Sequence, residues 1–310
     1  MPSHNDVQIT SCSACQNHHT SLNRCSRCRA VAYCSKDCQS AHWPTHKSDC
    51  KRPNYILEAH VLPNDITNPP VKRVLSRPAR ATFYELHRAL QVVFGWAGTH
   101  DWDFVVNDPE YPGPESGEAE MVELMRKIMR HNSRISGSNS PEEEAANDPR
   151  EYLVRIKVPQ DRNTMMPFVD SGMGNMARAH PRTPEKNAGR VKLFEVFDKE
   201  EYRGLEYAYT YDFGDNWEHV VKIVGRAPAT DNFSCTGGEG KGIAEDVGGF
   251  NGWEKLKAAY RTDNPDKDQR GKMKWFETQA SNADRDGLGG SRVARWSKAE
   301  VNRGLAECGL

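Results

Sequence analysis

Eight residues with metal-binding side chains fall within 39 positions near the N-terminus, spaced C-x2-C-x9-C-x2-C-x5-C-x3-C-x7-H-x3-C: Cys12, Cys15, Cys25, Cys28, Cys34, Cys38, His46 and Cys50. Zn²⁺ prefers thiolate and imidazole ligands in a tetrahedron, and four cysteines, or three and a histidine, close a structural site. Eight ligands therefore predict two structural zinc ions. The segment is too short to bury a core, so we expect the metal to supply most of its folding free energy.

Two other interpretations of these cysteines fit less well. A disulfide scaffold is typical of small secreted domains. However, the first ten residues, MPSHNDVQIT, are polar and contain no apolar signal segment. A redox C-x-x-C centre is expected beside a βαβ pattern, which the flanking sequence lacks. Zinc binding remains the prediction.

The stretch YCSKDCQSAHWPTHKSDC (33–50) resembles the second half of a MYND-type zinc finger, and the earlier cysteine pairs complete the pattern over residues 12–50. The resemblance implies interleaved sites, with one ion on Cys12, Cys15, Cys34 and Cys38 and the other on Cys25, Cys28, His46 and Cys50. It also implies protein binding through a shallow groove for proline-containing peptides, lined by Gln39 and Trp43. An exposed Trp beside an amide suits an extended peptide. Alternatively, Trp43 packs one finger helix onto another.

Local chemistry predicts two short helices in this finger. Ser35 is a suitable N-cap for a helix that carries Cys38, and Pro44 suits the first turn of a second helix. On that second helix His46 and Cys50, four residues apart, share a face. His42 is the rival ligand to His46, and we interpret it as a neighbour of the site. We expect His18 and His19 to be exposed.

The charge of the finger leaves a nucleic-acid interpretation open. Residues 1–53 carry seven Lys and Arg against three Asp, so contact with phosphates through a basic finger face is one alternative. Such an excess is more often a solvated surface. The spacing also lacks the linear pattern of fingers that insert a helix into the major groove. Nucleic-acid binding is therefore not favoured.

The remaining length predicts one further domain. The chain has 310 residues, and a break at Lys51-Arg52-Pro53 divides it into a finger (1–53) and a larger domain (54–310). No apolar stretch is long enough to cross a membrane. Only Cys235 and Cys308 lie outside the finger, and with no targeting segment this favours a reducing compartment, the cytoplasm or nucleus.

Strand and helix patterns alternate after the finger. Alternating apolar residues predict strands over 55–62, 71–77, 100–106 and 152–158, and a β-hairpin over 205–225 with its turn at FGDN. Residues 82–96 have apolar positions at helical spacing after a Thr82–Glu85 capping box, so a helix should pack on the first strand pair. Residues 191–197 fit a short strand or helix. Residues 107–149 predict a mobile insertion with one helix-like piece.

The hairpin carries a second resemblance. YTYDFGDNWEHVVKI (209–223) resembles the signature of the plasmid pRiA4b ORF-3-like family, as do residues 85–104, 235–256 and 296–305 in the same order. The resemblance covers most of residues 55–305, with departures at 107–149 and 159–190. It implies an α+β fold with a mainly antiparallel sheet and no particular activity.

Carboxylates and histidines gather in these blocks. The candidate residues are Asp212, Asp215, Glu218 and His219 on the hairpin, with Glu245, Asp246, His87, His100 and Cys235 able to converge on it. Carboxylates with histidine can hold Mg²⁺ or Mn²⁺ and activate water, so a metal-dependent hydrolase or nuclease is an alternative function.

A structural interpretation of the hairpin competes with this. Gly214, Asp215 and Asn216 are turn residues, Phe213 and Trp217 suit a core, and His219 suits a buried polar position. Lysine methyltransferases also contain MYND fingers, but no cofactor-binding pattern of that class follows here. The sequence therefore favours an adapter protein that binds zinc and a partner protein.

Overall fold

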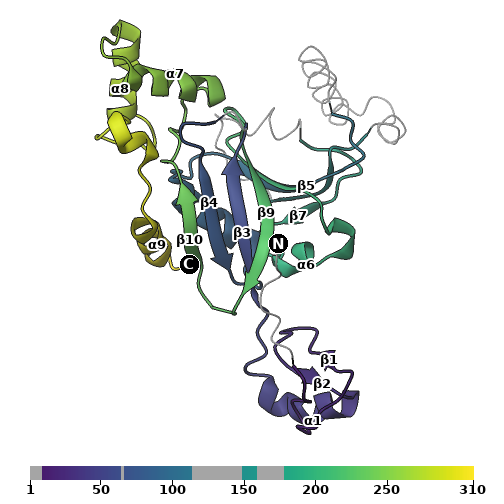
Figure 1. The fold of residues 1–310 in the computed structure, drawn as a ribbon. Helices are drawn as coiled ribbons and strands as arrows, with labels where there is room; N and C mark the ends of the chain where they lie inside the picture. The colour runs from purple at the N-terminus through teal and green to yellow at the C-terminus, as the bar shows by residue number, and fades with distance from the viewer. Residues whose placement is uncertain (1–8, 64–65, 114–148, 159–177) are drawn as a thin grey trace, which may run out of the picture.

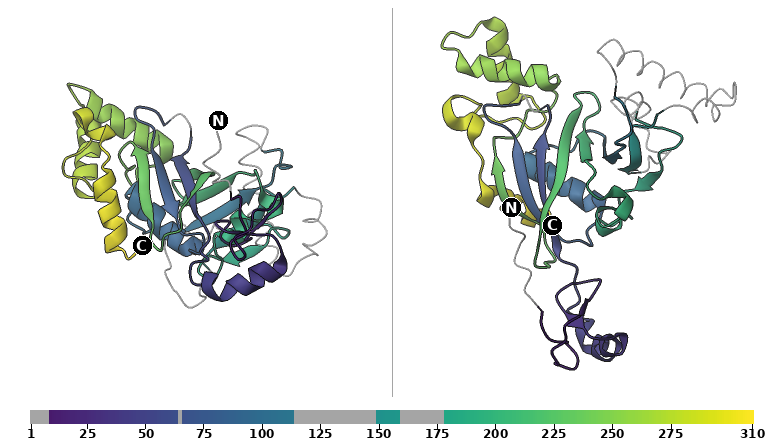
Figure 2. Two further views of the ribbon diagram at one scale, coloured as in Figure 1. Left: turned by 60° about the horizontal axis from the view of Figure 1, so that its bottom comes forward. Right: turned by 45° about the vertical axis from the view of Figure 1, so that its right-hand side comes forward.

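The structure, a computed structural model, describes residues 9–63, 66–113, 149–158 and 178–310. A small finger precedes a twisted sheet that is flanked by helices (Figure 1). The finger lies beyond one end of the sheet, and the C-terminal helices line one edge (Figure 2). The expected α+β class is confirmed.

Over its described residues, 9–53, the finger contains one helix rather than the two expected. Strands β1 (Asn23–Arg24) and β2 (Ala32–Tyr33) pair antiparallel, and helix α1 spans Lys36–His46. Ser35 caps α1 as predicted, because its side chain accepts a hydrogen bond from the Cys38 N–H. The prediction that Pro44 starts a second helix is wrong. Proline removes one backbone donor, and the helix continues because the Lys47 N–H donates to the Trp43 carbonyl.

Among the described residues of the larger domain, eight strands form one sheet in the order β10-β4-β3-β9-β8-β5-β6-β7. Their bounds are Asn54–Val61 (β3), Lys72–Arg77 (β4), Trp102–Asn107 (β5), Tyr152–Lys157 (β6), Glu185–Asn187 (β7), Tyr207–Tyr211 (β8), Trp217–Ala227 (β9) and Ser234–Glu239 (β10). Neighbours run antiparallel except β6 and β7, which are parallel. The predicted strands and hairpin are confirmed, whereas β7 and β10 were not predicted.

Helix α2 (Phe83–Phe94) covers one face of the sheet. It begins with the predicted capping box of Thr82 and Glu85 and ends at Gly95, whose φ of 77° suits a residue without a side chain. The Phe83 ring lies 5.2 Å from the Phe104 ring of β5, edge to face. Aromatic and aliphatic residues of α2 and the strands thus form the main core.

The opposite face of the sheet carries a buried ionic cluster. Asp103 and Arg155 have fully buried side chains, and the Arg155 Nε donates to an Asp103 oxygen at 2.6 Å. Arg178 donates to both oxygens of the same carboxylate. These two guanidinium groups lower the pKa of the Asp103 carboxyl against the opposing effect of its burial. The carboxylate therefore stays ionised and paired.

Further helices and turns lie in the described part of the larger domain. They are α6 (Phe194–Phe197), α7 (Gly249–Arg261), α8 (Lys267–Thr278), α9 (Lys298–Glu307) and the 3₁₀ turns Glu200–Tyr202 and Gly290–Ala294. Residues 191–197 thus contain a short helix, one of the two forms expected. The helix-like piece predicted within 107–149 lies outside the described residues.

Candidate metal centres and interaction surface

Four cysteine sulfurs converge on one side of the finger. The Sγ atoms of Cys12, Cys15, Cys34 and Cys38 all lie within 4.8 Å of one another. Cys15 and Cys34 are 3.8 Å apart, and Cys34 and Cys38 are 3.5 Å apart. A tetrahedral ion with Zn–S bonds of about 2.3 Å requires sulfur–sulfur edges of about 3.8 Å. This group therefore fits one zinc ion.

The second group has three sulfurs and one imidazole nitrogen. Cys25, Cys28, His46 and Cys50 are all buried, and their ligand atoms also lie within 4.8 Å of one another. Cys25 and Cys50 are 3.6 Å apart, and the Cys28 Sγ lies 3.4 Å from the His46 Nε2. This Cys₃His set fits a second zinc ion. The two groups interleave along the chain, as the family resemblance implies.

The same backbone turn presents the first cysteine pair of each group. The Gln16 N–H donates to the Cys12 carbonyl at 2.8 Å, and the Arg29 N–H donates to the Cys25 carbonyl at 2.9 Å. Gln16 and Arg29 both have left-handed backbones, with φ of 62° and 57°. Each C-x2-C pair thus ends in a tight turn that aims both sulfurs at one point. The remaining ligands come from α1 and the segments beside it.

The surroundings of two thiols in the first group shift their pKa values in opposite directions. Hydrogen bonds from the Cys15 backbone N–H lower the pKa of Cys12 to about 6. The contact with the Cys38 sulfur raises the pKa of Cys34 to about 12. Neighbouring thiolates repel, so several can ionise together only around a cation, which zinc supplies. All four positions of each ion are protein ligands, so these ions stabilise the fold and leave no place for water.

Gln39 and Trp43 lie one turn apart on α1, and both side chains are half-buried. Residues at this spacing share a helix face. The Trp43 ring packs against the finger's cysteine-rich core and meets the His46 ring edge to face at 6.0 Å. Trp43 therefore packs within the finger and still leaves part of its ring in solvent.

His18, His19 and His42, the other histidines in the described part of the finger, lie outside both ligand groups. The His42 Nδ1 is 3.1 Å from the Tyr33 hydroxyl, and its ring stacks on His46 at 5.7 Å. The ring thus supports the ligand His46 from outside the site. His18 and His19 are exposed, and the His19 Nε2 lies 3.9 Å from the Cys15 sulfur.

Strand alternation separates the hairpin residues Glu218 and His219. His219 is fully buried on the α2 face, where its Nδ1 lies 3.1 Å from the Tyr209 carbonyl and its Nε2 lies 3.3 Å from the Trp96 Nε1. Burial lowers its pKa to about 4. Glu218 projects to the opposite face near Arg178, and burial raises its pKa. Consecutive strand residues point to opposite faces, so these two cannot share a site.

Two more candidate carboxylates tie loops together. Asp215 accepts a hydrogen bond from the Gly248 N–H at 3.1 Å. Glu245 is fully buried and accepts hydrogen bonds from the Ala97 N–H at 2.6 Å and the Tyr211 hydroxyl at 2.8 Å. These contacts join the hairpin turn and β8 to the loops at 96–99 and 245–248.

His87 and Cys235 are buried at separate places. The His87 ring stacks on Trp102 at 3.8 Å, its Nδ1 lies 2.8 Å from the Tyr209 hydroxyl, and burial lowers its pKa to about 3. Burial raises the pKa of the Cys235 thiol, which donates to the Gly237 carbonyl. Both residues belong to the core.

Among the candidates of the larger domain, His100, Asp212 and Asp246 come together. One ligand atom from each lies within 4.8 Å of the other two. Asp212 follows β8, His100 precedes β5, and Asp246 precedes α7. All three residues are among the candidates from the sequence, but nothing in the sequence marks them as a group.

Comparisons with protein-family models match two parts of the chain. Residues 12–50 match the MYND finger, and residues 60–286 match the plasmid pRiA4b ORF-3-like protein. The finger is therefore a zinc-binding protein-interaction module, and its eight ligand residues fit two zinc ions. The activity of the larger domain is not established by either match.

Curated relatives share a short part of the chain. SET domain and MYND-type zinc finger protein 6 of Schizosaccharomyces pombe is 40% identical over 53 residues, 17% of this chain and 11% of that protein. Human histone-lysine N-methyltransferase SMYD3 is 48% identical over 40 residues, 13% of this chain and 9% of that protein. The chain thus spans about a tenth of these relatives.

A solved structure covers more of the chain. The protein of unknown function MM3350 from Methanosarcina mazei Go1 has a TM-score of 0.48 and 20% identity, over 80% of this chain and 95% of that one. In the part of the chain that the structure describes, no helix is long and apolar enough to cross a membrane.

The family model matches residues 60–286, well over half of the chain. This chain therefore belongs to the plasmid pRiA4b ORF-3-like family and carries a MYND finger ahead of that domain.

Proposed function

We propose that this chain is an adapter whose MYND finger docks a proline-containing segment of a partner protein on the face of α1 that carries Gln39 and Trp43. One observation supports this most directly. Trp43 packs on His46, a ligand in the second zinc group, and remains partly exposed beside Gln39. The indole offers a flat apolar surface to a proline ring, and the Gln39 amide can pair with a peptide backbone.

Zinc would fix this surface in advance of binding. Cys38 and His46 are ligand residues that flank the docking face on α1. With both anchored, the helix need not order when the partner arrives, so less conformational entropy is lost on binding. The finger would then bind as a rigid module.

We further propose that the finger (1–53) folds independently of the larger domain (54–310). The contacts at the junction include the ion pairs Lys51–Asp231 and Arg52–Asp198. The first pair is largely exposed, at 51% and 81% of its side chains, and exposed pairs contribute at most about 1 kcal/mol. That pair constrains the finger weakly, whereas Arg52 is better anchored, with its Cζ 4.3 Å over the Phe194 ring.

The test uses two fluorescein-labelled peptides of equal length, one with proline at every third position and one with alanine there. Fluorescence anisotropy of the full chain should show tighter binding of the proline peptide. Trp43→Ala should weaken it at least about thirtyfold, because a central Trp commonly contributes 2 kcal/mol or more. Gln39→Ala should weaken it about fivefold, the effect of one hydrogen bond.

The matched control is Ala41→Gln. Ala41 is exposed and lies roughly opposite Gln39 around the helix, so this change places an amide on the other face. Native mass spectrometry should still find two zinc ions on every variant, which separates loss of the surface from loss of the finger. Equal affinity for the two peptides, or wild-type binding by Trp43→Ala, would contradict the proposal.

A further inference from the structure

Three side chains from distant parts of the larger domain gather beside the hairpin turn. The His100 Nε2 lies 3.1 Å from an Asp246 oxygen, and the His100 Nδ1 lies 3.9 Å from an Asp212 oxygen. The His100 and Asp212 side chains are 8% and 4% exposed, whereas Asp246 is 48% exposed. The group is therefore buried at its base and open to solvent at Asp246.

Backbone contacts hold the three segments in place. The Asp212 N–H donates to the Asp101 carbonyl at 2.9 Å, which joins the end of β8 to the residue after His100. One Asp212 oxygen accepts from the Gly214 N–H at 2.8 Å, so its carboxylate direction is fixed. Asp246 is oriented by a hydrogen bond from the Ser281 hydroxyl at 3.1 Å. Ligands that are held before the ion arrives lose little freedom on binding it.

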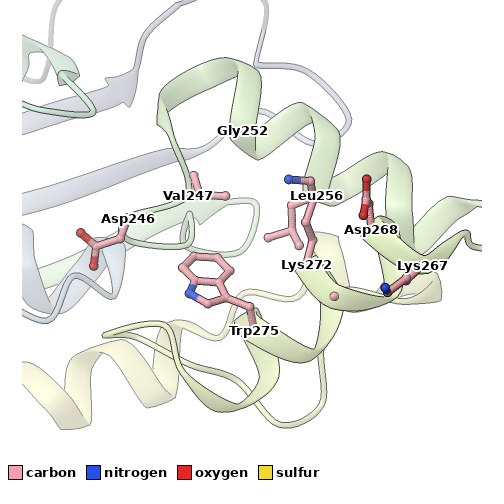
Figure 3. A pocket seen from close by; sticks show the side chains of 9 residues that line it. Asp246, Val247, Gly252, Leu256, Lys267, Asp268, Lys272 and Trp275 are labelled. Carbon is pink, nitrogen blue, oxygen red and sulfur yellow. The ribbon is translucent and has the colours of Figure 1, made fainter.

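A pocket borders the group. It has a volume of about 570 Å³ and lies between α7 and α8, with Asp246, Val247, Leu256, Lys272 and Trp275 among its lining residues. Figure 3 shows Asp246 at one end of this pocket, next to Val247 and Trp275. Lys267 and Lys272 lie toward the other end. Functional metal sites commonly lie beside such a space, where a ligand can reach the ion.

We propose that His100, Asp212 and Asp246 bind one divalent first-row cation. One imidazole nitrogen and two carboxylate oxygens suit Mn²⁺, Fe²⁺ or Zn²⁺, and the absence of sulfur distinguishes this set from the two finger groups. Three protein ligands leave coordination positions for water or a bound molecule, unlike the four-ligand finger sites. The site lies in the larger domain and is independent of peptide docking by the finger.

Mn²⁺ is the probe that separates this site from the finger. The full chain, with its finger loaded with zinc, is titrated with Mn²⁺ while electron paramagnetic resonance measures the free ion. Thiolate ligands favour zinc over Mn²⁺, so the finger should keep its zinc. We expect one Mn²⁺ per chain. Asp246→Asn should weaken its binding at least about tenfold, since it exchanges an anionic ligand for a neutral one.

Asp268→Asn is the matched control, because Asp268 is an exposed carboxylate that lines the same pocket outside the three-residue group. It should bind Mn²⁺ like the wild type. Asp246 is half-exposed, so its substitution should leave the fold intact, which circular dichroism checks. No Mn²⁺ binding at millimolar concentration, or equal affinity in the Asp246→Asn and Asp268→Asn variants, would overturn the proposal.

Discussion

Arg77, at the end of β4, is a fully buried cation that should cost the fold stability. None of its three guanidinium nitrogens has a hydrogen-bond partner among the described residues. Its Cζ lies 5.2 Å from the centre of the Phe233 ring, a cation–π contact. Burial holds the pKa of Arg77 below its usual range, which reflects the cost of removing its charge from water.

The magnitude follows from two opposing terms. Burying an ion costs several kcal/mol after relaxation, and a desolvated cation–π contact returns about 2 kcal/mol. Arg77→Met removes both terms and fills most of the space with an unbranched apolar side chain. We therefore expect the free energy of unfolding to rise by about 1 to 4 kcal/mol. For a domain of this size, each kcal/mol raises Tm by about 3 °C.

Arg155→Met is the matched substitution, and we expect it to change the free energy of unfolding in the opposite direction. Arg155 is equally buried but pairs with Asp103 at 2.6 Å. Its removal leaves a buried carboxylate that keeps only part of its compensation, from Arg178. The free energy of unfolding should fall by about 3 to 5 kcal/mol. The two variants thus remove the same charge from equally buried places and differ in whether the charge was paired.

Urea unfolding followed by tryptophan fluorescence measures both effects. All tryptophans except Trp43 lie after residue 54, so the signal reports mainly on the larger domain. The reasoning is refuted if Arg77→Met lowers the free energy of unfolding by more than about 1 kcal/mol, or if both variants change it in the same direction. Either result would mean that Arg77 is as well compensated as Arg155.

Two further predictions concern pH and zinc. The His219 imidazole is neutral in the folded protein, where its pKa is about 4, and it has the usual pKa of about 6.5 in the unfolded chain. Its contribution to the free energy of unfolding is therefore complete above pH 6.5 and is lost as the pH falls toward 4. Between pH 7 and 4 the wild type should lose up to roughly 3 kcal/mol more than His219→Gln in urea unfolding; equal losses would contradict this. Native mass spectrometry should find two zinc ions on the wild type, and Cys34→Ser should make the finger, but not the larger domain, sensitive to trypsin. Collapse of the far-UV circular dichroism of the whole chain in Cys34→Ser would contradict independent folding.

The finger was predictable because its chemistry is local. Zinc accepts few ligand types at few spacings, so the order of cysteines and histidine indicates two ions before any fold is known. The helix pattern failed at Pro44. The preference of proline for the first turn of a helix favours a helix start at Pro44, yet α1 continues through Pro44 to His46. Anchoring of both Cys38 and His46 within one short segment outweighs the local preference.

The main strands were predictable because apolar and polar residues alternate along them. The two strands that were not predicted, β7 and β10, lack this alternation. β10 reads Ser-Cys-Thr-Gly-Gly-Glu, with one apolar side chain, and it forms because β4 offers a free edge to its backbone. β7 has three residues and no apolar side chain, and it pairs with β6 in parallel. Tertiary pairing rather than side-chain pattern creates these strands, so no reading of the segment alone predicts them.

Which carboxylates meet beside the hairpin depends on backbone geometry that composition does not express. Asp212 and Asp246 both adopt left-handed backbones, with φ of 60° and 58°, and they follow the buried residues Tyr211 and Glu245. At the end of β8 the left-handed backbone of Asp212 breaks the alternation of the strand and turns its side chain away from the line of its neighbours. Asp212 thereby reaches the edge beside His100, whereas Glu218, which keeps strand geometry, projects to the opposite face from His219. Asp212 and Glu218 are an even number of positions apart, so strand alternation alone would place them on the same face. The turn between them instead brings Asp212 to His100 and leaves Glu218 near Arg178.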